Sequence, residues 1–348
     1  MARESSRSWR RHLRGFVDHA SRATLLLSHF ERRMRRRPTL LMYHRVLPGA
    51  QCEDYPFPSL VMPADAFEQQ VAWLARRTEV VTAAEAIQRM QSPGEPAAKP
   101  VVAMTFDDGY VDNYAIAATI LEKHGVRGTF FLASDFVGKD RLLWYDHAAL
   151  LVIVAADDVL CRSAKACGMP IPSSHDLAVG RVAAWVELLK QTGPGVRAQW
   201  LAAVEAESPP VDRDNYRAMR PEDAKDLASR GHEIGAHSVS HEILPLLDAN
   251  ALTAELECSR EAIVQWTGRQ VSGFCYPNGS HDERVVSATR AAGYAYACTT
   301  DSPFGTPVDD VLRMARVDIN RSRVTRPSGR FDLVAFRAEL SGLHELMR

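Results

Sequence analysis

Short apolar segments alternate with longer amphipathic segments along most of this chain, and this alternation restricts the fold more than any other feature. The apolar segments have the length of strands, whereas the amphipathic ones repeat their apolar positions with the period of a helix. The segments predicted as strands are 39–43, 79–82, 101–106, 128–133, 233–236, 271–275 and 294–298. Those predicted as helices are 63–74, 83–90, 112–124, 221–230, 249–266 and 282–292. This alternation favours an α/β fold with a parallel sheet, either a barrel or a doubly wound sheet.

Two stretches do not follow this alternation. Residues 140–219 are predicted to form a largely helical insertion, and residues 1–37 a basic amphipathic N-terminal helix. We therefore divide the chain into an arm (1–37), one α/β domain that contains the insertion (38–325), and a C-terminal tail or helix (326–348).

The arm contains eleven Arg and three acidic residues, a net charge of 11 − 3 = +8, which leaves −1 − 8 = −9 on the rest of the chain. Its apolar residues recur at alternating spacings of four and three, as on one stripe of a helix. They are Trp9, Leu13, Phe16, Ala20, Ala23, Leu27, Phe30 and Met34. Two interpretations stay open: a helix lying on an anionic membrane surface, or a helix docked on its own domain or on a partner chain.

No apolar stretch approaches the roughly 18 residues needed to span a bilayer. We recognise no ordinary signal peptide, and the six Cys contain no CxxC pair, so we expect reduced thiols. These features predict a cytoplasmic protein, with peripheral contact at the inner face of the membrane through residues 1–37. We expect no nucleic-acid partner.

Three polar motifs follow directly after predicted strands. They are Asp107-Asp108-Gly109-Tyr110, His237-Ser-Val-Ser-His241 and Tyr276-Pro277-Asn278-Gly279. Because the carboxyl ends of parallel strands gather at one face of the sheet, the three motifs are expected to meet there.

Each motif alone is weak evidence, since an Asp-Asp-Gly is usually a plain turn. Together they offer a carboxylate and two imidazoles, and we expect His237 and His241 to share one face of a helical turn. Such a three-ligand set is typical of catalytic rather than structural zinc. Its open position can hold a water whose pKa falls to about 7. The second Asp of the turn is then available as a general base.

Thr105-Phe-Asp-Asp-Gly109 and the two later motifs, in this order, resemble the first three motifs of the polysaccharide deacetylases, also called the NodB-homology family or carbohydrate esterase family 4. The resemblance covers roughly residues 39–320. It implies a distorted (β/α)7 barrel, a divalent metal, usually zinc, and hydrolysis of an acetamide on a sugar. By motif, Asp107 would be the general base, with Asp108, His237 and His241 as metal ligands. The backbone N–H of Tyr276 would help to stabilise the oxyanion.

The sequence departs from the family pattern at two places. Many members have an arginine at the start of the third motif, where this chain has Phe274-Cys275, and Arg316 is the candidate replacement. Many members also end with a Leu-His pair whose His is the general acid. Here that pair is Leu343-His344, near the terminus, whereas Leu40-Leu-Met-Tyr-His44 resembles the first strand of the circularly permuted branch of the family. We therefore expect His44 to be the acid, with His344 as the alternative.

Three residues are candidate substrate contacts. Trp144 resembles an aromatic residue that lines the sugar site in the permuted branch, although a buried Trp at a domain seam fits equally well. Tyr110 and Pro277 belong to the motifs themselves. The expected substrate is an N-acetylated glycan or a lipid-linked amino sugar. The alternatives are a deformylase or another amide hydrolase, such as one acting on a cyclic ureide, and an inactive barrel that binds carbohydrate.

Overall fold

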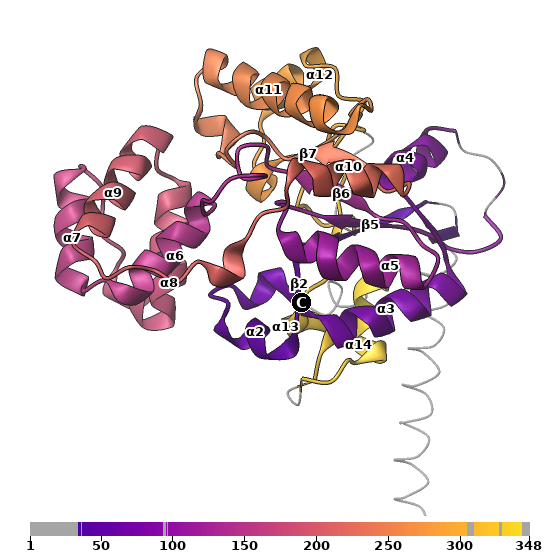
Figure 1. Cartoon of the computed structure of the whole chain (residues 1–348), viewed down its shortest axis with the longest axis horizontal. Coiled ribbons are helices and arrows are strands. Elements are labelled where there is room, and N and C mark those ends of the chain that lie inside the picture. The colour runs from indigo at the N-terminus through magenta and orange to yellow at the C-terminus, as the bar shows by residue number, and fades with distance from the viewer. Residues whose placement is uncertain are drawn as a thin grey trace, which may run out of the picture.

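The computed structural model describes residues 34–35, 37–92, 95, 97–304, 310–326 and 329–342. An α/β body and a smaller all-helical lobe make up this part of the chain (Figure 1). The amphipathic helix predicted over 1–37 lies mostly outside the described residues, and so does His344, the alternative acid. Met34, the last residue of the predicted apolar stripe, is described and packs in the hydrophobic core of the body.

Parallel strands form the main sheet of the body, and every pairing between them is parallel. Their spatial order is β10-β1-β5-β6-β7-β8-β9, and β4 pairs with β5 beside this path. The bounds are β1 Thr39–Tyr43, β4 Glu79–Val81, β5 Val101–Phe106, β6 Thr129–Leu132, β7 Glu233–Ala236, β8 Gly273–Cys275, β9 Tyr296–Cys298 and β10 Val317–Asp318. A separate small sheet pairs β2 (Arg45–Leu47) with β3 (Val61–Pro63). The predicted parallel α/β fold is confirmed.

The sheet curls into a distorted barrel for two visible reasons. First, β4 and β6 share one edge of β5: β4 pairs with residues 101–103 and β6 with residues 105–106. Second, the segment 314–318 joins the last strand to the first, because Met314 bridges Cys298 of β9 and Val317 pairs with Leu41 of β1. Of the two folds that the alternation allowed, the structure has the barrel.

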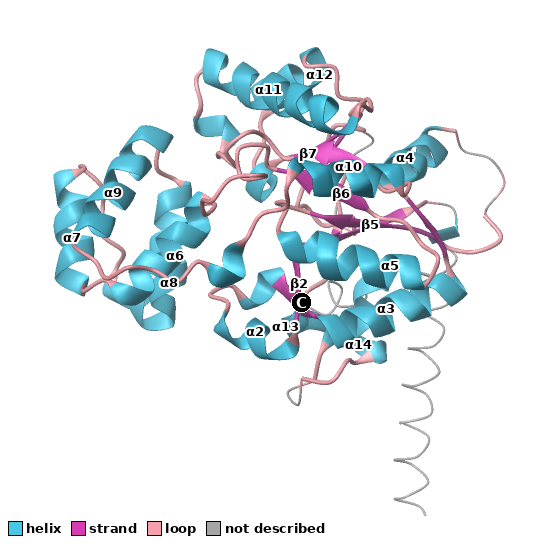
Figure 2. Cartoon of the chain, viewed as in Figure 1, coloured by secondary structure: helices cyan, strands magenta, loops and turns pink. Residues whose placement is uncertain are grey.

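Helices cover the outside of the barrel (Figure 2); most were predicted, but the short ones at 49–54 and 321–324 were not. They are α2 Gly49–Asp54, α3 Ala64–Arg77, α4 Ala83–Gln91, α5 Thr119–Lys123, α10 Pro221–Ser229, α11 Ala249–Thr267, α12 Glu283–Ala291, α13 Arg321–Val324 and α14 Leu333–Ser341. The helix expected over 112–124 is not α-helical throughout, since Asn113–Ala118 forms a π-helix that runs into α5. The α3 helix buries Phe67, Val71 and Leu74, the face that its sequence pattern indicated.

The helical lobe is built by α6 (Trp144–Val154), α7 (Asp157–Ala166), α8 (Ser174–Lys190) and α9 (Pro194–Ala206), which lie to one side of the barrel in Figure 1. Its hydrophobic core continues into Tyr110, Ala133 and Phe136 of the body, and in it the rings of Trp185 and Trp200 stack with centroids 5.3 Å apart. The lobe therefore packs against the body beside the mouth of the barrel.

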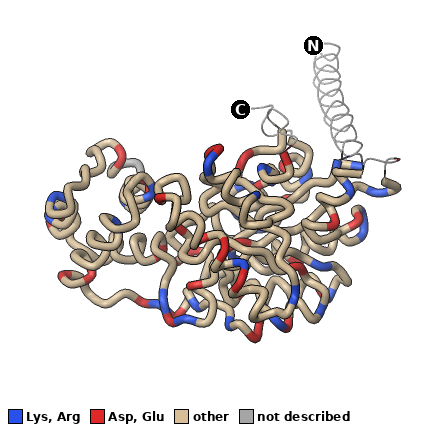
Figure 3. Tube along the Cα trace, turned by 90° about the horizontal axis from the view of Figure 1, so that it is seen from above, with Lys and Arg blue, Asp and Glu red and all other residues tan. Residues whose placement is uncertain are grey.

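Acidic and basic residues are interspersed along the described chain (Figure 3). Among the described residues, no helix is both long enough and apolar enough to cross a membrane.

Candidate active site

The turn after β5 brings two carboxylates to the mouth of the barrel. The backbone N–H of Asp107 donates to the carbonyl of Tyr43 (3.1 Å), which fixes the turn to β1. Asp108 has a φ of 80° and Gly109 a φ of 97°. A side chain at Gly109 would also approach Leu132 and Val137 to 3.2 Å, so the tight turn requires glycine there.

Asp108, His237 and His241 converge at this mouth and are all buried. Oδ1 of Asp108 lies 3.4 Å from Nε2 of His237 and 3.3 Å from Nε2 of His241. The Nδ1 of His237 lies 2.7 Å from the carbonyl oxygen of Cys275, and because a carbonyl only accepts, Nδ1 carries the proton and leaves Nε2 as the ligating atom.

The donor set fits a divalent cation. Oδ1 of Asp108 is buried and has no hydrogen-bond partner among the described residues, although an unpaired buried carboxylate oxygen is costly. Its other oxygen accepts a hydrogen bond from the hydroxyl of Tyr145 (2.9 Å). One carboxylate oxygen and two neutral imidazole nitrogens are the ligands that zinc and similar ions prefer at catalytic sites.

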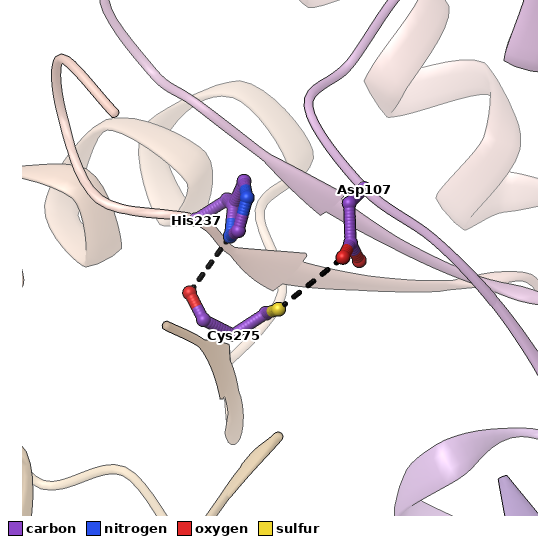
Figure 4. Close-up of side chains that lie close together, drawn as sticks. All are labelled: Asp107, His237 and Cys275. Carbon is purple, nitrogen blue, oxygen red and sulfur yellow. Dashed lines mark hydrogen bonds between the residues drawn. The ribbon is translucent and has the colours of Figure 1, made fainter. Parts of the chain in front are cut away.

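In a second group, Asp107, His237 and Cys275, the possible ligand atoms also lie within 4.8 Å of one another (Figure 4). Its members are already satisfied internally, because the guanidinium of Arg316 contacts both Asp107 and the Cys275 sulfur. Burial raises the pKa of the Cys275 thiol well above its usual value, and a protonated thiol is a poor metal ligand. The first group is therefore the candidate metal centre.

The loop that carries the two histidines is not helical, which corrects the expectation of a helical turn. Ser238 (φ 64°) and His241 (φ 57°) both have left-handed backbone conformations. The N–H of His241 donates to Oγ of Ser238 (3.0 Å), and the carboxylate of Glu255 on α11 accepts from the N–H groups of Val239 (2.7 Å) and Ser240 (3.0 Å). The histidines converge because the loop is folded in this way, and not because of their spacing of four.

Backbone strain is concentrated at the three motifs. Among the described residues, the non-glycine residues with positive φ are Asp108, Ser238, His241 and Asn278. Each lies in one of the motifs predicted to form the site. Strained backbone of this kind collects at functional sites.

Arg316 contacts Asp107, as expected of a replacement for the missing motif arginine. Its Nη1 and Nη2 donate to the two carboxylate oxygens at 2.8 and 2.7 Å, a bidentate pair that is fully buried. Burial raises the pKa of Asp107, but the charge and hydrogen bonds of Arg316 outweigh it, so that the pKa lies below its usual value. The carboxylate is thus held ionised.

His44 directly follows β1 (Thr39–Tyr43). Its Nε2 is 3.9 Å from Oδ2 of Asp107. The amide of Asn113 donates to its carbonyl at 2.6 Å, which ties the residue to the π-helix. The side chain of His44 is partly exposed and lines the same cavity as the metal group.

That cavity has a volume of about 150 Å³, and both the barrel and the helical lobe form its walls. Its lining residues are His44, Phe57, Ser59, Leu60, Asp107, Asp108, Trp144, Tyr145, Val186, Lys190, His237, His241, Tyr276, Asn278 and Thr300. The sequence did not predict that the lobe residues other than Trp144, the segment 57–60 and Thr300 line this cavity.

Trp144 is held on several sides, and it both lines the cavity and joins the lobe to the barrel. Its indole N–H donates to the carbonyl of His241 (2.7 Å), and the guanidinium of Arg197 lies 4.1 Å from its ring centroid. Trp144 can therefore both border a bound sugar and pack at the seam between the two parts of the molecule.

Three predicted roles need correction. The backbone N–H of Tyr276 donates to the carbonyl of Cys298 (3.0 Å), so it is used by the sheet and is not available to an oxyanion. Tyr110 is fully buried, with its hydroxyl donating to Asp146, and Pro277 is buried outside the cavity wall, so neither reaches a substrate. In the third motif, Asn278 is the exposed residue on the wall.

A buried polar network behind the site was also missed. The hydroxyl of Tyr145, which bonds Asp108, lies 2.9 Å from that of Tyr110, and the Asp146 carboxylate accepts from Tyr110 and from Tyr55 (2.8 Å). Burial raises the pKa of Asp146 to about 7. The sequence signal for this network was Tyr145 and Asp146, which follow Trp144 in a helix that is apolar after His147.

With this geometry in view, comparison with known proteins identifies the family. The family model described as polysaccharide deacetylase matches residues 94–297, more than half of the chain. The chain belongs to the polysaccharide deacetylase family. Enzymes of this family depend in general on a metal, in agreement with the Asp–His–His group.

Individual relatives are more distant. The Bacillus subtilis protein YxkH, which carries the name of a polysaccharide deacetylase, is 34% identical over 100 residues, covering 28% of this chain and 33% of its own. The match thus spans about a third of that relative's length. The structure is similar to the Streptococcus pyogenes deacetylase PplD in complex with acetate (TM-score 0.54, 15% identity, 82% of this chain and 93% of that one). It is also similar to IcaB from Ammonifex degensii (TM-score 0.54, 16% identity, 88% and 97%). At these identities the likeness shows the shared fold.

Proposed function

We propose that this protein is a metal-dependent N-deacetylase that hydrolyses the acetamide of an N-acetylated amino sugar. The observation that carries the proposal is the buried, unpartnered Oδ1 of Asp108 between two histidine nitrogens, next to an aspartate that Arg316 keeps ionised. Membership of the polysaccharide deacetylase family supports the same reaction.

Asp108, His237 and His241 would hold the divalent cation, with zinc as the expected ion. Such an ion supplies Lewis-acid stabilisation of negative charge and lowers the pKa of water. The N–H of Tyr276 is not part of this proposal, because the sheet already uses it.

Asp107 is the proposed general base. Its carboxylate faces the cavity and is oriented by two hydrogen bonds from Arg316, so it can accept the proton of the water that attacks the acetamide carbon. The water oxygen adds to this carbon, the C–N bond breaks, and acetate and the free amine are formed.

His44 is the proposed general acid. An amine leaves poorly unless its nitrogen is protonated, and His44 lines the cavity with its Nε2 3.9 Å from Oδ2 of Asp107. Its role can be separated from that of the base with an aryl acetate, whose leaving group needs no proton.

We expect His44→Ala to lower acetamide hydrolysis about 10²–10⁴-fold while changing aryl ester hydrolysis little. Asp107→Asn should lower both reactions, and neither variant should lose metal. Equal losses of His44→Ala on the amide and the ester would show that His44 is not the acid.

The cavity restricts the substrate. A volume of about 150 Å³ is below the roughly 300–1,000 Å³ of pockets that enclose drug-sized ligands. We infer that it admits the acetamide and part of one sugar ring, which Trp144 borders, while the rest of a glycan lies outside.

The test of the activity is acetate release from N-acetylhexosamine oligomers, free and lipid-linked, with and without chelator. Elemental analysis should find about one metal ion per wild-type chain and far less in His237→Ala. Turnover of N-formyl sugars or cyclic ureides in place of acetamides would favour the alternative hydrolase. A purified protein without metal and without turnover would favour an inactive, carbohydrate-binding barrel.

We also propose that the chain works at the cytoplasmic side of a membrane. The support is the +8 net charge and apolar stripe of residues 1–37 in the sequence. Deletion of residues 1–33 should leave the turnover of a short soluble substrate nearly unchanged, because the site residues all lie after them and the buried core residue Met34 is kept.

A further inference from the structure

A second cavity, of about 430 Å³, lies at the other end of the parallel sheet from the catalytic cavity. Thr78 and Pro100, which precede β4 and β5, line this second cavity, whereas Asp107 and Asp108 follow β5. Because the strands are parallel, residues before them and residues after them lie at opposite ends of the barrel. We call this second cavity the basic pocket.

The basic pocket is strongly cationic. Its lining includes the basic residues Arg35, Arg76, Arg77, Lys99 and Arg337, and no acidic residue. Within the part of the chain that the structure describes, Arg76, Arg77 and Lys99 form no ion pair with a carboxylate. No described carboxylate therefore contacts these three side chains directly, although Lys99, after Arg89, helps to lower the pKa of Glu79.

Apolar side chains accompany these cations. Trp73 lines the basic pocket and packs edge-on against Phe336, with ring centroids 6.0 Å apart. Leu333 is 39% exposed and Val334 is 70% exposed, at the start of α14 beside the pocket. Solvent-exposed aliphatic side chains next to basic residues are the arrangement by which a protein surface enters the headgroup region of an anionic membrane.

We propose that the basic pocket binds the phosphate of an anionic phospholipid headgroup, with Leu333 and Val334 in contact with the apolar boundary beneath it. A free phosphate ion would use the same cations. The exposed aliphatic pair favours the lipid, because an isolated phosphate makes no use of it.

This inference does not depend on the deacetylase activity, and it sets the orientation of the molecule on a surface. If the basic pocket faces the membrane, the catalytic cavity faces away from it. The six residues of β5, at roughly 3.3 Å each, separate the two by about 20 Å. The enzyme would then reach sugars displayed away from the surface.

The test uses the full chain and sedimentation with vesicles of phosphatidylcholine, with or without phosphatidylglycerol. Each basic residue near an anionic surface contributes roughly fivefold to binding, so removing three should weaken it about 100-fold. The variant is Arg76→Gln/Arg77→Gln/Lys99→Gln. The control is Arg217→Gln/Lys225→Gln/Arg269→Gln, which removes the same charge from exposed positions outside the basic pocket.

The proposal predicts a large loss for the pocket variant and only a small one for the control, with soluble-substrate turnover unchanged in both. Leu333→Ser/Val334→Ser should weaken vesicle binding without changing the thermal shift produced by inorganic phosphate alone. Equal losses in the two triple variants would show a general charge effect and overturn the pocket. Vesicle binding that is unchanged in the serine variant, together with phosphate binding at the pocket, would show a site for free phosphate instead of lipid.

Discussion

Asp146 is a fully buried carboxyl group whose charge should make the stability of the fold depend on pH. Burial raises its pKa from 3.8 to about 7, although Tyr110, Arg45 and Tyr55 favour the charged form; Asp108 adds to the increase. Between these two pH values the folded state therefore binds one more proton than the unfolded state. The stabilising contribution is complete below pH about 4 and is lost as the pH rises through about 7.

The size of the effect follows from the pKa difference. About 3 pKa units at 1.36 kcal/mol each correspond to about 4 kcal/mol of unfolding free energy. In Asp146→Asn the side chain is neutral at every pH, and its amide can still exchange hydrogen bonds with the hydroxyls of Tyr110 and Tyr55. The difference in unfolding free energy between variant and wild type should thus shift by about 4 kcal/mol in favour of the variant between pH 4 and pH 8.

Urea denaturation at a series of pH values measures this difference, with chelator present throughout so that metal binding does not contribute. Taking the difference between two proteins that share all other groups cancels the titration of those groups. A difference that stays constant to within about 1 kcal/mol over this range would refute a buried Asp146 with a raised pKa.

Three other substitutions test the site and the barrel. Asp107→Asn should retain the metal but lose about 10²–10⁴-fold in kcat, measured by acetate release beside elemental analysis, and near-normal turnover would exclude it as the base. Tyr145→Phe removes the hydrogen bond to the proposed ligand carboxylate, so metal affinity in a chelator competition should fall about 10–100-fold, whereas an unchanged affinity would exclude this positioning role. Gly273→Ala places a Cβ 2.3 Å from the hydroxyl of Tyr296 and should lower stability by about 1–3 kcal/mol in thermal unfolding. Gly195→Ala, where an added Cβ meets nothing within 4 Å, is the matched control, and equal effects of the two would contradict the packing argument.

The sequence predicted the regular parts of this fold well because they depend on local patterns. All six residues of β5 are buried, and five of them are apolar, a pattern typical of a strand covered on both faces. Its end placed Asp107 and Asp108 at the mouth of the barrel. The sharing of the β5 edge by β4 and β6 could not be predicted in this way, because it depends on the register between strands far apart in the chain.

The details of the site depend on contacts that no local pattern contains. The loop of His237 and His241 takes its shape from left-handed residues and from Glu255, which lies on a different element. The motif assigned the N–H of Tyr276 to the oxyanion. In the structure this N–H donates a hydrogen bond to the carbonyl of Cys298 on the neighbouring strand, which the motif does not reveal. Arg316 was identified because an expected arginine was missing, and its contact with Asp107 joins residues 209 positions apart.

The position of Arg316 in the barrel links catalysis to local unfolding. This residue lies on the segment 314–318, which joins β9 to β1 by only a few backbone pairings. A partial opening that releases this segment would withdraw the guanidinium from Asp107 while most of the sheet stays folded. Turnover should therefore disappear at a lower denaturant concentration than the far-ultraviolet circular dichroism signal, and the amide hydrogens of 314–318 should exchange faster than those of β5. In relatives whose arginine belongs to the third motif, the loss of turnover and the loss of the circular dichroism signal should occur at more similar denaturant concentrations.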